Sequence, residues 1–80
     1  MRLTWDQSHN VASITIGEGD LRGRARDAWR ASDDVVFDVD AAGAVINIQI
    51  LDPARILAGV TTAEEALSRV LGSLVTVRAS

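Results

Sequence analysis

Residues 35–53, with the sequence VVFDVDAAGAVINIQILDP, decide the fold of this chain. Apolar side chains occupy every second position over residues 35–39, and the alternation resumes over residues 46–50. Because successive side chains of a strand point to opposite faces, each run can bury one face of a sheet and expose the other. Between the runs, Gly43 can adopt the positive φ that a tight turn requires. The stretch predicts a β-hairpin that ends at Pro53, since proline cannot donate to a central ladder.

The chain has 80 residues and no cysteine. We expect one domain over residues 1–80 with a small core, because a chain of this length buries only about 60–65% of its unfolded surface. The absence of cysteine excludes disulfides and is typical of a reducing compartment. The sequence has no long apolar span and no signal-peptide pattern. We therefore expect a small soluble domain in the cytoplasm, with no membrane partner.

The formal net charge is −3, and all eight basic residues are arginine. A sequence-independent nucleic-acid binder gains its affinity mainly by neutralising phosphates, so this charge disfavours that class. The three aromatic residues, Trp5, Trp29 and Phe37, form no evident base-stacking platform. We therefore expect no nucleic-acid partner.

A second hairpin is predicted near the N-terminus, from residues 3–5 and 11–16 around a polar turn. Residues 21–31 fit two patterns, because their apolar positions have roughly helical spacing and also alternate with arginine. We prefer a strand over residues 24–30, since it would continue an antiparallel meander. A helix over the same stretch is the alternative.

The sheet is followed by helical signals. Asp52 suits the N-cap and Pro53 the first position of a short helical turn over residues 53–57. Residues 61–65, TTAEE, contain two overlapping capping boxes: Thr61 with Glu64, and Thr62 with Glu65. The helix that follows has one apolar stripe: Ala63, Ala66, Leu67, Val70 and Leu71. We expect Gly72 to end this helix and residues 74–77 to form a last short strand.

These elements predict an α+β fold: an antiparallel β-meander of about five strands, one short helical turn, one C-terminal helix and a short final strand. Five strands span about 20–25 Å, whereas a ten-residue helix is about 15 Å long and about 10 Å wide. One such helix cannot cover the apolar face of the sheet, so we expect a homodimer or a complex with another small protein. That face comprises Trp5, Ile14, Ile16, Phe37, Val39, Ile46, Ile48 and Ile50.

The residues expected to carry such an interaction are Trp5, Trp29, Phe37, Ile46 and Ile48. The preferred interpretation of the two tryptophans is that they fill the core. The alternative is that Trp29, which is flanked by charged residues, anchors an interface, because tryptophan is enriched at binding hot spots.

The arginine-rich segment 22–30 holds half of the positive charge. It suggests an anion-binding or small-ligand module that would use Arg24, Arg26 and Arg30. The preferred interpretation is that these arginines face the aspartates of residues 38–40 across neighbouring strands, in pairs worth a few tenths to about 1 kcal/mol each.

Residues 38–43 share the D-x-D-x-x-G opening of a calcium-binding loop. Ala42 occupies the third ligand position and Gln49 that of the bidentate glutamate, so we interpret the segment as a solvated turn. His9 lies in a polar turn, and no nucleophile motif accompanies it. The sequence also lacks the common phosphate-loop, hydrolase and metalloprotease motifs. We therefore expect no catalytic residue, no metal site, no cofactor and no enzymatic activity.

The order of these signals resembles the small bacterial domain-of-unknown-function family 2283. Members have an early aromatic–aspartate pair and an alternating strand, which correspond here to residues 5–6 and 12–16. They continue with a D-x-D-x-x-G hairpin and an I-x-I-L-D-x-S/A ending, which correspond to residues 38–43 and 48–54. The resemblance covers residues 3–58.

This chain departs from the family pattern at Gln49, where members often have glutamate, and by the helix and strand after Gly59. The resemblance implies a small bacterial β-meander protein, similar in size and gene setting to the antitoxin partners of small toxins. It implies no activity and no site residues. Our leading hypothesis is a non-enzymatic protein-interaction module, either a dimer or an antitoxin-like partner.

Overall fold

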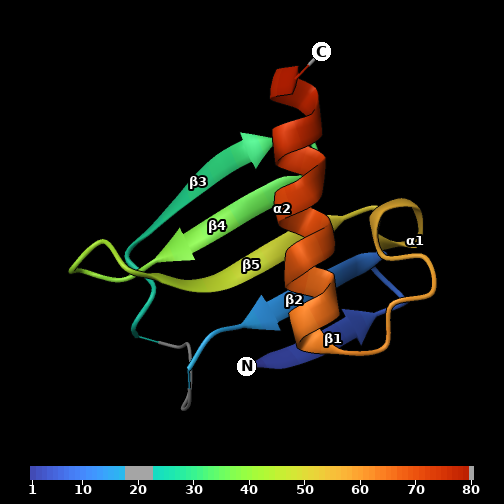
Figure 1. The fold of residues 1–80 in the computed structure, drawn as a ribbon. Coiled ribbons are helices and arrows are strands. Elements are labelled where there is room, and N and C mark those ends of the chain that lie inside the picture. Colours follow the sequence, from blue (N-terminus) through green and yellow to red (C-terminus); the bar gives the residue numbers. More distant parts are fainter. Residues whose placement is uncertain (18–22, 80) are drawn as a thin grey trace.

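A computed structural model describes residues 1–17 and 23–79, with side chains described as far as residue 74 (Figure 1). Its elements are β1 (Arg2–Asp6), β2 (Val11–Thr15), β3 (Asp27–Ser32), β4 (Val35–Val39), β5 (Val45–Leu51), α1 (Pro53–Ile56) and α2 (Ala63–Ala79). Both predicted hairpins are present, as β1–β2 and β4–β5.

The strands form one antiparallel sheet in the order β1-β2-β5-β4-β3, which confirms the predicted α+β fold class. β3, β4 and β5 follow one another as a meander. At one point the sheet differs from a strictly sequential meander, because β2 pairs with β5 and not with β3. The order of β2, β5, β4 and β3 is that of a Greek key. The predicted central hairpin therefore lies in the interior of the sheet, and β1 and β3 are its edges.

The turn between β4 and β5 is organised by Asp40. Its Oδ1 accepts hydrogen bonds from the backbone N–H groups of Ala42 and Ala44, both at 2.9 Å. Gly43 has a φ of 85°, as the turn prediction required, and donates its N–H to the Asp40 carbonyl at 3.0 Å. Asp40 is thus a turn-forming residue, a common role of aspartate in hairpins.

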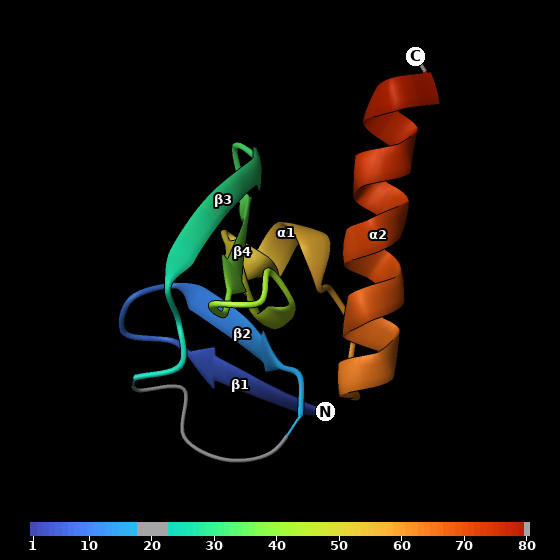
Figure 2. The ribbon, with the colours of Figure 1, turned by 90° about the vertical axis from the view of Figure 1, so that its left-hand side faces the viewer.

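The core lies between the sheet and the two helices, which are on the same side of it (Figure 2). Ile14, Val35 and Ile50 from the sheet are fully buried together with Ala66 and Val70 from α2. Burial of each large aliphatic side chain contributes about 1.5–3 kcal/mol. This cluster attaches the first half of α2 to the sheet.

The helix starts agree with the sequence in position but differ in detail. Asp52 is the N-cap of α1, but its backbone is left-handed (φ 57°, ψ 56°) and its side chain makes no capping hydrogen bond. The expected side-chain cap is therefore wrong, because the Asp52 carboxylate accepts a hydrogen bond from Arg55 Nε at 3.3 Å instead. At α2, the Glu65 N–H donates to Thr62 Oγ1 at 3.1 Å, which confirms the Thr62 cap.

The predicted end of the last helix at Gly72 and the predicted final strand over residues 74–77 are both wrong, because α2 continues to Ala79. A glycine inside a helix costs only about 1 kcal/mol, and valine or threonine a few tenths each. Once α2 is nucleated and packed, each further residue is added without a new nucleation cost. These penalties are therefore too small to stop it.

Residues 27–32 form strand β3, which confirms the strand interpretation of the arginine-rich segment over the helical one, although the strand begins later than predicted. Leu21 and Arg22 lie outside the described residues. Within the described part of the chain, no helix is long and apolar enough to span a membrane.

Candidate interaction surface

A row of direct cross-strand neighbours crosses the helix-side face of the sheet from edge to edge: Leu3, Ile14, Ile48, Phe37 and Trp29. Directly opposite residues in a sheet point to the same face. Trp29 therefore shares a face with the core residues Ile14 and Ile48. Burial falls along the row, from 0% exposed at Ile14 and 2% at Ile48, through the half-buried Phe37, to 55% exposed at Trp29.

The position of α2 explains this gradient. The helix packs mainly against β1, β2 and α1, and most of β3 lies to one side of it (Figure 1). Every residue from Asp27 to Ala31 is exposed, and Ser32 is half-buried. We call the exposed strand segment Asp27–Ala31, together with the half-buried Phe37 beside it, the β3 edge.

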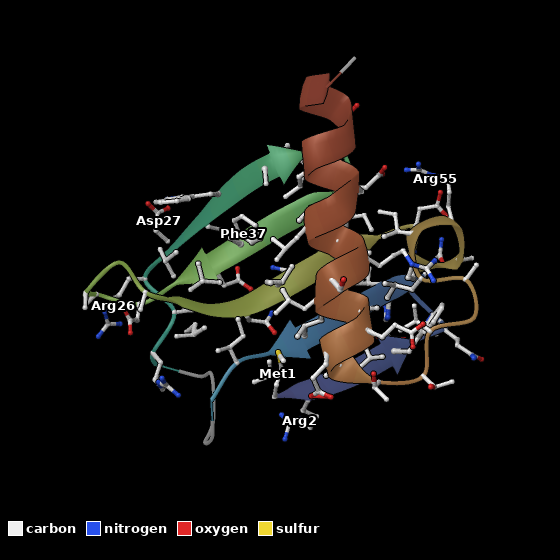
Figure 3. All side chains as sticks on the ribbon, in the orientation of Figure 1. Met1, Arg2, Arg26, Asp27, Phe37 and Arg55 are labelled. Atoms are coloured by element: carbon white, nitrogen blue, oxygen red, sulfur yellow. The ribbon has the colours of Figure 1, made fainter. Side chains whose placement is uncertain are left out.

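The structure separates the five residues predicted for an interaction. Ile46 and Ile48 are 3% and 2% exposed, so they belong to the core and are not available to a partner. Trp5 on β1 is 38% exposed and Trp29 is 55% exposed, so the interpretation of both as core residues is wrong. Phe37 lies beside α2 and not beneath it (Figure 3). Trp29 and Phe37 are adjacent in register, whereas Trp5 lies on the opposite edge of the sheet.

The other face of the sheet carries a polar network between neighbouring strands. Asn47 Nδ2 donates to Asp38 Oδ2 at 2.9 Å, and Gln49 Nε2 donates to both Asp38 oxygens at 3.1 and 3.0 Å. Thr15 Oγ1 donates to Asn47 Oδ1 at 3.3 Å. Thr15 and Asn47 are 5% and 4% exposed. The carboxylate of Asp38 is thus held by amides of β5, and the network fixes the register of three strands.

The arginines of the predicted anion site do not converge on one point. Arg24 and Arg26 precede β3, and Arg26 lies at one end of the sheet, far from Arg55 (Figure 3). Arg30 lies four positions further on, about 13 Å along an extended strand. Its Nη1 donates to the Asp33 carbonyl at 2.8 Å, and not to Asp38 or Asp40 as expected. All three side chains are exposed.

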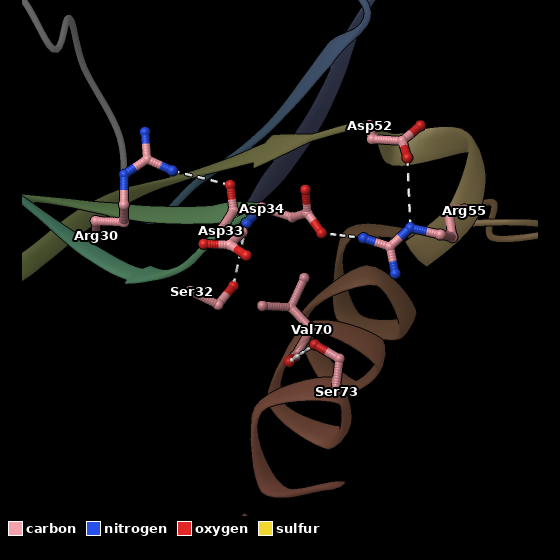
Figure 4. A network of polar contacts seen from close by, with 8 residues as sticks. All are labelled: Arg30, Ser32, Asp33, Asp34, Asp52, Arg55, Val70 and Ser73. Atoms are coloured by element: carbon pink, nitrogen blue, oxygen red, sulfur yellow. Dashed lines mark hydrogen bonds and ion pairs between the residues drawn. The ribbon is translucent and has the colours of Figure 1, made fainter. Parts of the chain in front are cut away.

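A further polar cluster joins the β3–β4 turn to α1 (Figure 4). Arg55 forms an ion pair with Asp34, and its Nε lies 3.3 Å from Asp52 Oδ2. The cluster borders a surface cleft of about 440 Å³, which Ser73 and Leu74 of α2 also line. Ser73 Oγ donates to the Val70 carbonyl at 2.7 Å. Because its cation already has two carboxylate partners, this cleft offers little to a charged ligand.

A second cleft, of about 640 Å³, lies between α1 and α2 and is lined by Arg55 and Arg69. Arg69 Nη1 donates to the carbonyl oxygens of Ile56 and Ala58, at 3.5 and 3.3 Å, and its Nη2 lies 3.8 Å from Glu65 Oε1. Both arginines of this cleft therefore hold the α1 region in place. Neither cleft is lined by Arg24, Arg26 or Arg30.

The lone histidine lies in the exposed turn between β1 and β2. His9 Nδ1 is 2.8 Å from Asp6 Oδ2, and Ser8 Oγ donates to Asp6 Oδ1 at 2.7 Å. These hydrogen bonds lower the pKa of Asp6 to about 2, and the one from Ser8 has the larger effect. The triplet forms a polar turn on the surface. Among the described residues, no group of three or more acidic or histidine side chains is placed to hold a metal ion.

Sequence reasoning missed two features of this surface. The Asp38 network had a signal, because Asn47 and Gln49 alternate with isoleucines in the strand that pairs with Asp38. Of the two Arg55 ion pairs, the one with Asp52 could have been predicted, because the two residues are three positions apart. The one with Asp34 could not, because Asp34 is distant in sequence.

The fold and the surface define a small α+β protein whose edge strand β3 is exposed from Asp27 to Ala31. No family model, no curated protein and no solved structure matches this chain.

Proposed function

We propose that this chain is a non-enzymatic protein-interaction module that binds a protein partner through the β3 edge. The observation that carries the proposal is Trp29, which is 55% exposed on an edge strand while its cross-strand row continues into the core. Tryptophan contributes a large apolar area to an interface and is enriched at binding hot spots. An apolar ring in this position gains most when a partner covers it.

The backbone of β3 supports the same proposal. An edge strand presents unpaired N–H and C=O groups on its outer side, which is a template for a strand from another chain. β3 contains no proline and no lysine, two residues that commonly block such an edge. Its register irregularity lies between Arg30 and Ser32, so the strand is regular from Asp27 to Arg30.

The sharper version of the proposal is an antitoxin-like role in a bacterial cytoplasm, which rests on the family resemblance alone. The alternative function, anion binding by Arg24, Arg26 and Arg30, has less support. Its three side chains are spread along β3 and its approach, whereas an anion site needs donors that converge on one point.

The experiment that tests the proposal compares Trp29→Ser with Trp5→Ser, a matched change on the opposite edge strand. Each tagged protein is cross-linked in its native cells, purified, and analysed by native mass spectrometry. We expect the wild type and Trp5→Ser to carry the same stoichiometric protein partner, either a further copy or a different chain. We expect Trp29→Ser to lose it. A partner retained equally by all three proteins, or a wild type with none, would contradict the proposal.

A further inference from the structure

We infer that the partner is a second copy of this chain, joined edge to edge through β3 by an antiparallel, two-fold symmetric pairing centred on Trp29. This inference rests on the proposed function, because it takes the β3 edge to be a binding surface. It goes further by naming the occupant and the register.

The first argument is the distribution of charge along the edge. Arg24 and Arg26 lie just before β3, whereas Asp33 and Asp34 form the turn just after it. An antiparallel second copy places the basic approach of each chain beside the acidic turn of the other, and two-fold symmetry repeats this favourable contact. A parallel copy would instead bring like charges together at both ends.

The second argument is the register. A two-fold axis perpendicular to the sheet keeps both copies of α2 on the same side, so the residues opposite each other must come from the same face. With the axis at Trp29, the tryptophan lies opposite the partner's Trp29. Arg30 then lies opposite the partner's Ala28.

The neighbouring registers are unfavourable because they place arginines opposite each other. With the axis at Ala28, Arg26 lies opposite the partner's Arg30. With the axis at Arg30, that arginine lies opposite itself. Like charges directly opposite each other destabilise a strand pair. The register centred on Trp29 has no like charges directly opposite, and it places Trp29 at the middle of the exposed segment Asp27–Ala31.

The pairing joins two sheets into one continuous sheet and covers the open end of the row described above. Two tryptophans that face each other across the axis form an aromatic cross-strand pair, one of the favourable pairs in antiparallel sheets. Phe37 lies directly opposite Trp29 within each chain, so the apolar row continues through both copies.

The test uses charges at position 29, with the oligomeric mass measured by light scattering at micromolar concentration. We expect the wild type to have the mass of two chains. Trp29→Lys alone and Trp29→Glu alone each place like charges across the axis, so each is expected to have the mass of one chain. An equimolar mixture of the two is expected to recover the dimer, with one chain of each kind by native mass spectrometry.

Circular dichroism shows whether each variant is folded, and an exposed Trp29 makes loss of the fold unexpected. A wild type with the mass of one chain overturns the inference. So do single variants that remain dimeric, since their contact would then lie elsewhere.

A second measurement uses the absence of cysteine from the chain. Directly opposite side chains have Cβ atoms about 4.5–5.5 Å apart, which is close to the range that a disulfide bridges. Trp29→Cys is therefore expected to form a covalent dimer under mild oxidation. Ala31→Cys is the control, because its two copies would be four positions apart, about 13 Å along the strands. Equal cross-linking of both variants would overturn the inferred register.

The two proposals can fail separately. If the purified chain is a monomer but cells yield a different protein that depends on Trp29, the second-copy inference is overturned and the proposed function stands. If the chain is a monomer and no partner depends on Trp29, both are overturned.

Discussion

The two edge strands of the sheet, β1 and β3, differ in what lies over them. β1 packs against α2, and its Leu3 contacts the core. β3 lies mostly to one side of that helix, and its residues from Asp27 to Ala31 are all exposed. Each strand carries one exposed tryptophan: Trp5 on β1 is 38% exposed and Trp29 on β3 is 55% exposed. A β-strand pattern shows which side chains share a face, but the position across the sheet determines whether that face is covered.

This difference has a consequence for binding. The helix-side face is open at the β3 edge, so a partner does not need to displace α2 to reach Trp29. Ile46 and Ile48, which the sequence also suggested for an interaction, are beneath the helical layer or within the sheet interior and contribute to stability instead.

The largest expected effect contrasts the covered and the open ends of the row. Ile14→Ala removes a fully buried side chain, and we expect it to lower the free energy of unfolding by about 2–5 kcal/mol. Trp29→Ala at the open end should lower it by less than about 1.5 kcal/mol, since the side chain is 55% exposed and lies opposite Phe37. Urea unfolding at submicromolar concentration measures both. Equal losses would mean that the row is covered along its whole length.

The next effect concerns the face of the sheet opposite the helices. Asp38→Ala removes the acceptor of three hydrogen bonds from Asn47 and Gln49, and Asn47 is 4% exposed. A buried amide left without its partner costs about 1–3 kcal/mol. Asp27→Ala is the control: it removes an exposed hydrogen bond from the Ala28 N–H at 2.8 Å and should cost less, about 0.5 kcal/mol. A neutral Asp38→Ala would show that water replaces the carboxylate there without cost.

A smaller effect concerns the attachment of α2 over β1 and β2. Thr62→Ala removes the hydrogen bond from the Glu65 N–H to Thr62 Oγ1, and we expect a loss of about 1 kcal/mol. Thr61→Ala changes the neighbouring threonine, which the sequence placed in an equivalent capping box, and should be close to neutral. Urea unfolding of the two variants distinguishes the boxes. A larger loss for Thr61→Ala than for Thr62→Ala would show that Thr61, and not Thr62, caps the helix.

Much of the fold could be predicted because local patterns determine it. The alternation in residues 35–39 and 46–50 and the positive φ of Gly43 define the central hairpin without long-range information. The sheet order was less accessible, because the pairing of β2 with β5 depends on contacts between residues distant in sequence. The prediction of the end of α2 was wrong for another reason. The helix and strand propensities of valine and threonine differ by less free energy than the packing that anchors the helix contributes.

The candidate surface was predictable only in part. Alternation placed Phe37 on the apolar face, which is correct, and the strand register adds Trp29 directly opposite it. It could not show that Ile48 on that face would be buried while Trp29 would be 55% exposed, because that depends on where α2 crosses the sheet. Arg24, Arg26 and Arg30 looked like a cluster in the sequence but do not converge, because an extended chain separates side chains that are close in sequence.

The smallest expected effect lies at the β1 edge, in the turn that joins it to β2. The pKa of Asp6 is lowered from 3.8 to about 2, first by the hydrogen bond from Ser8 and then by that from His9. Because the folded value lies below the unfolded one, the turn stabilises the fold above about pH 4, and this contribution is lost as the pH falls through about 2. Since the Asp6 side chain is 53% exposed, the change in stability should be slight. We therefore expect it to be seen best in an NMR titration of the Asp6 carboxyl carbon. Ser8→Ala should raise that pKa toward its ordinary value, whereas Ser13→Ala, within β2, should leave it unchanged. An Asp6 that still titrates near 2 without Ser8 would assign the lowered pKa to the hydrogen bond with His9.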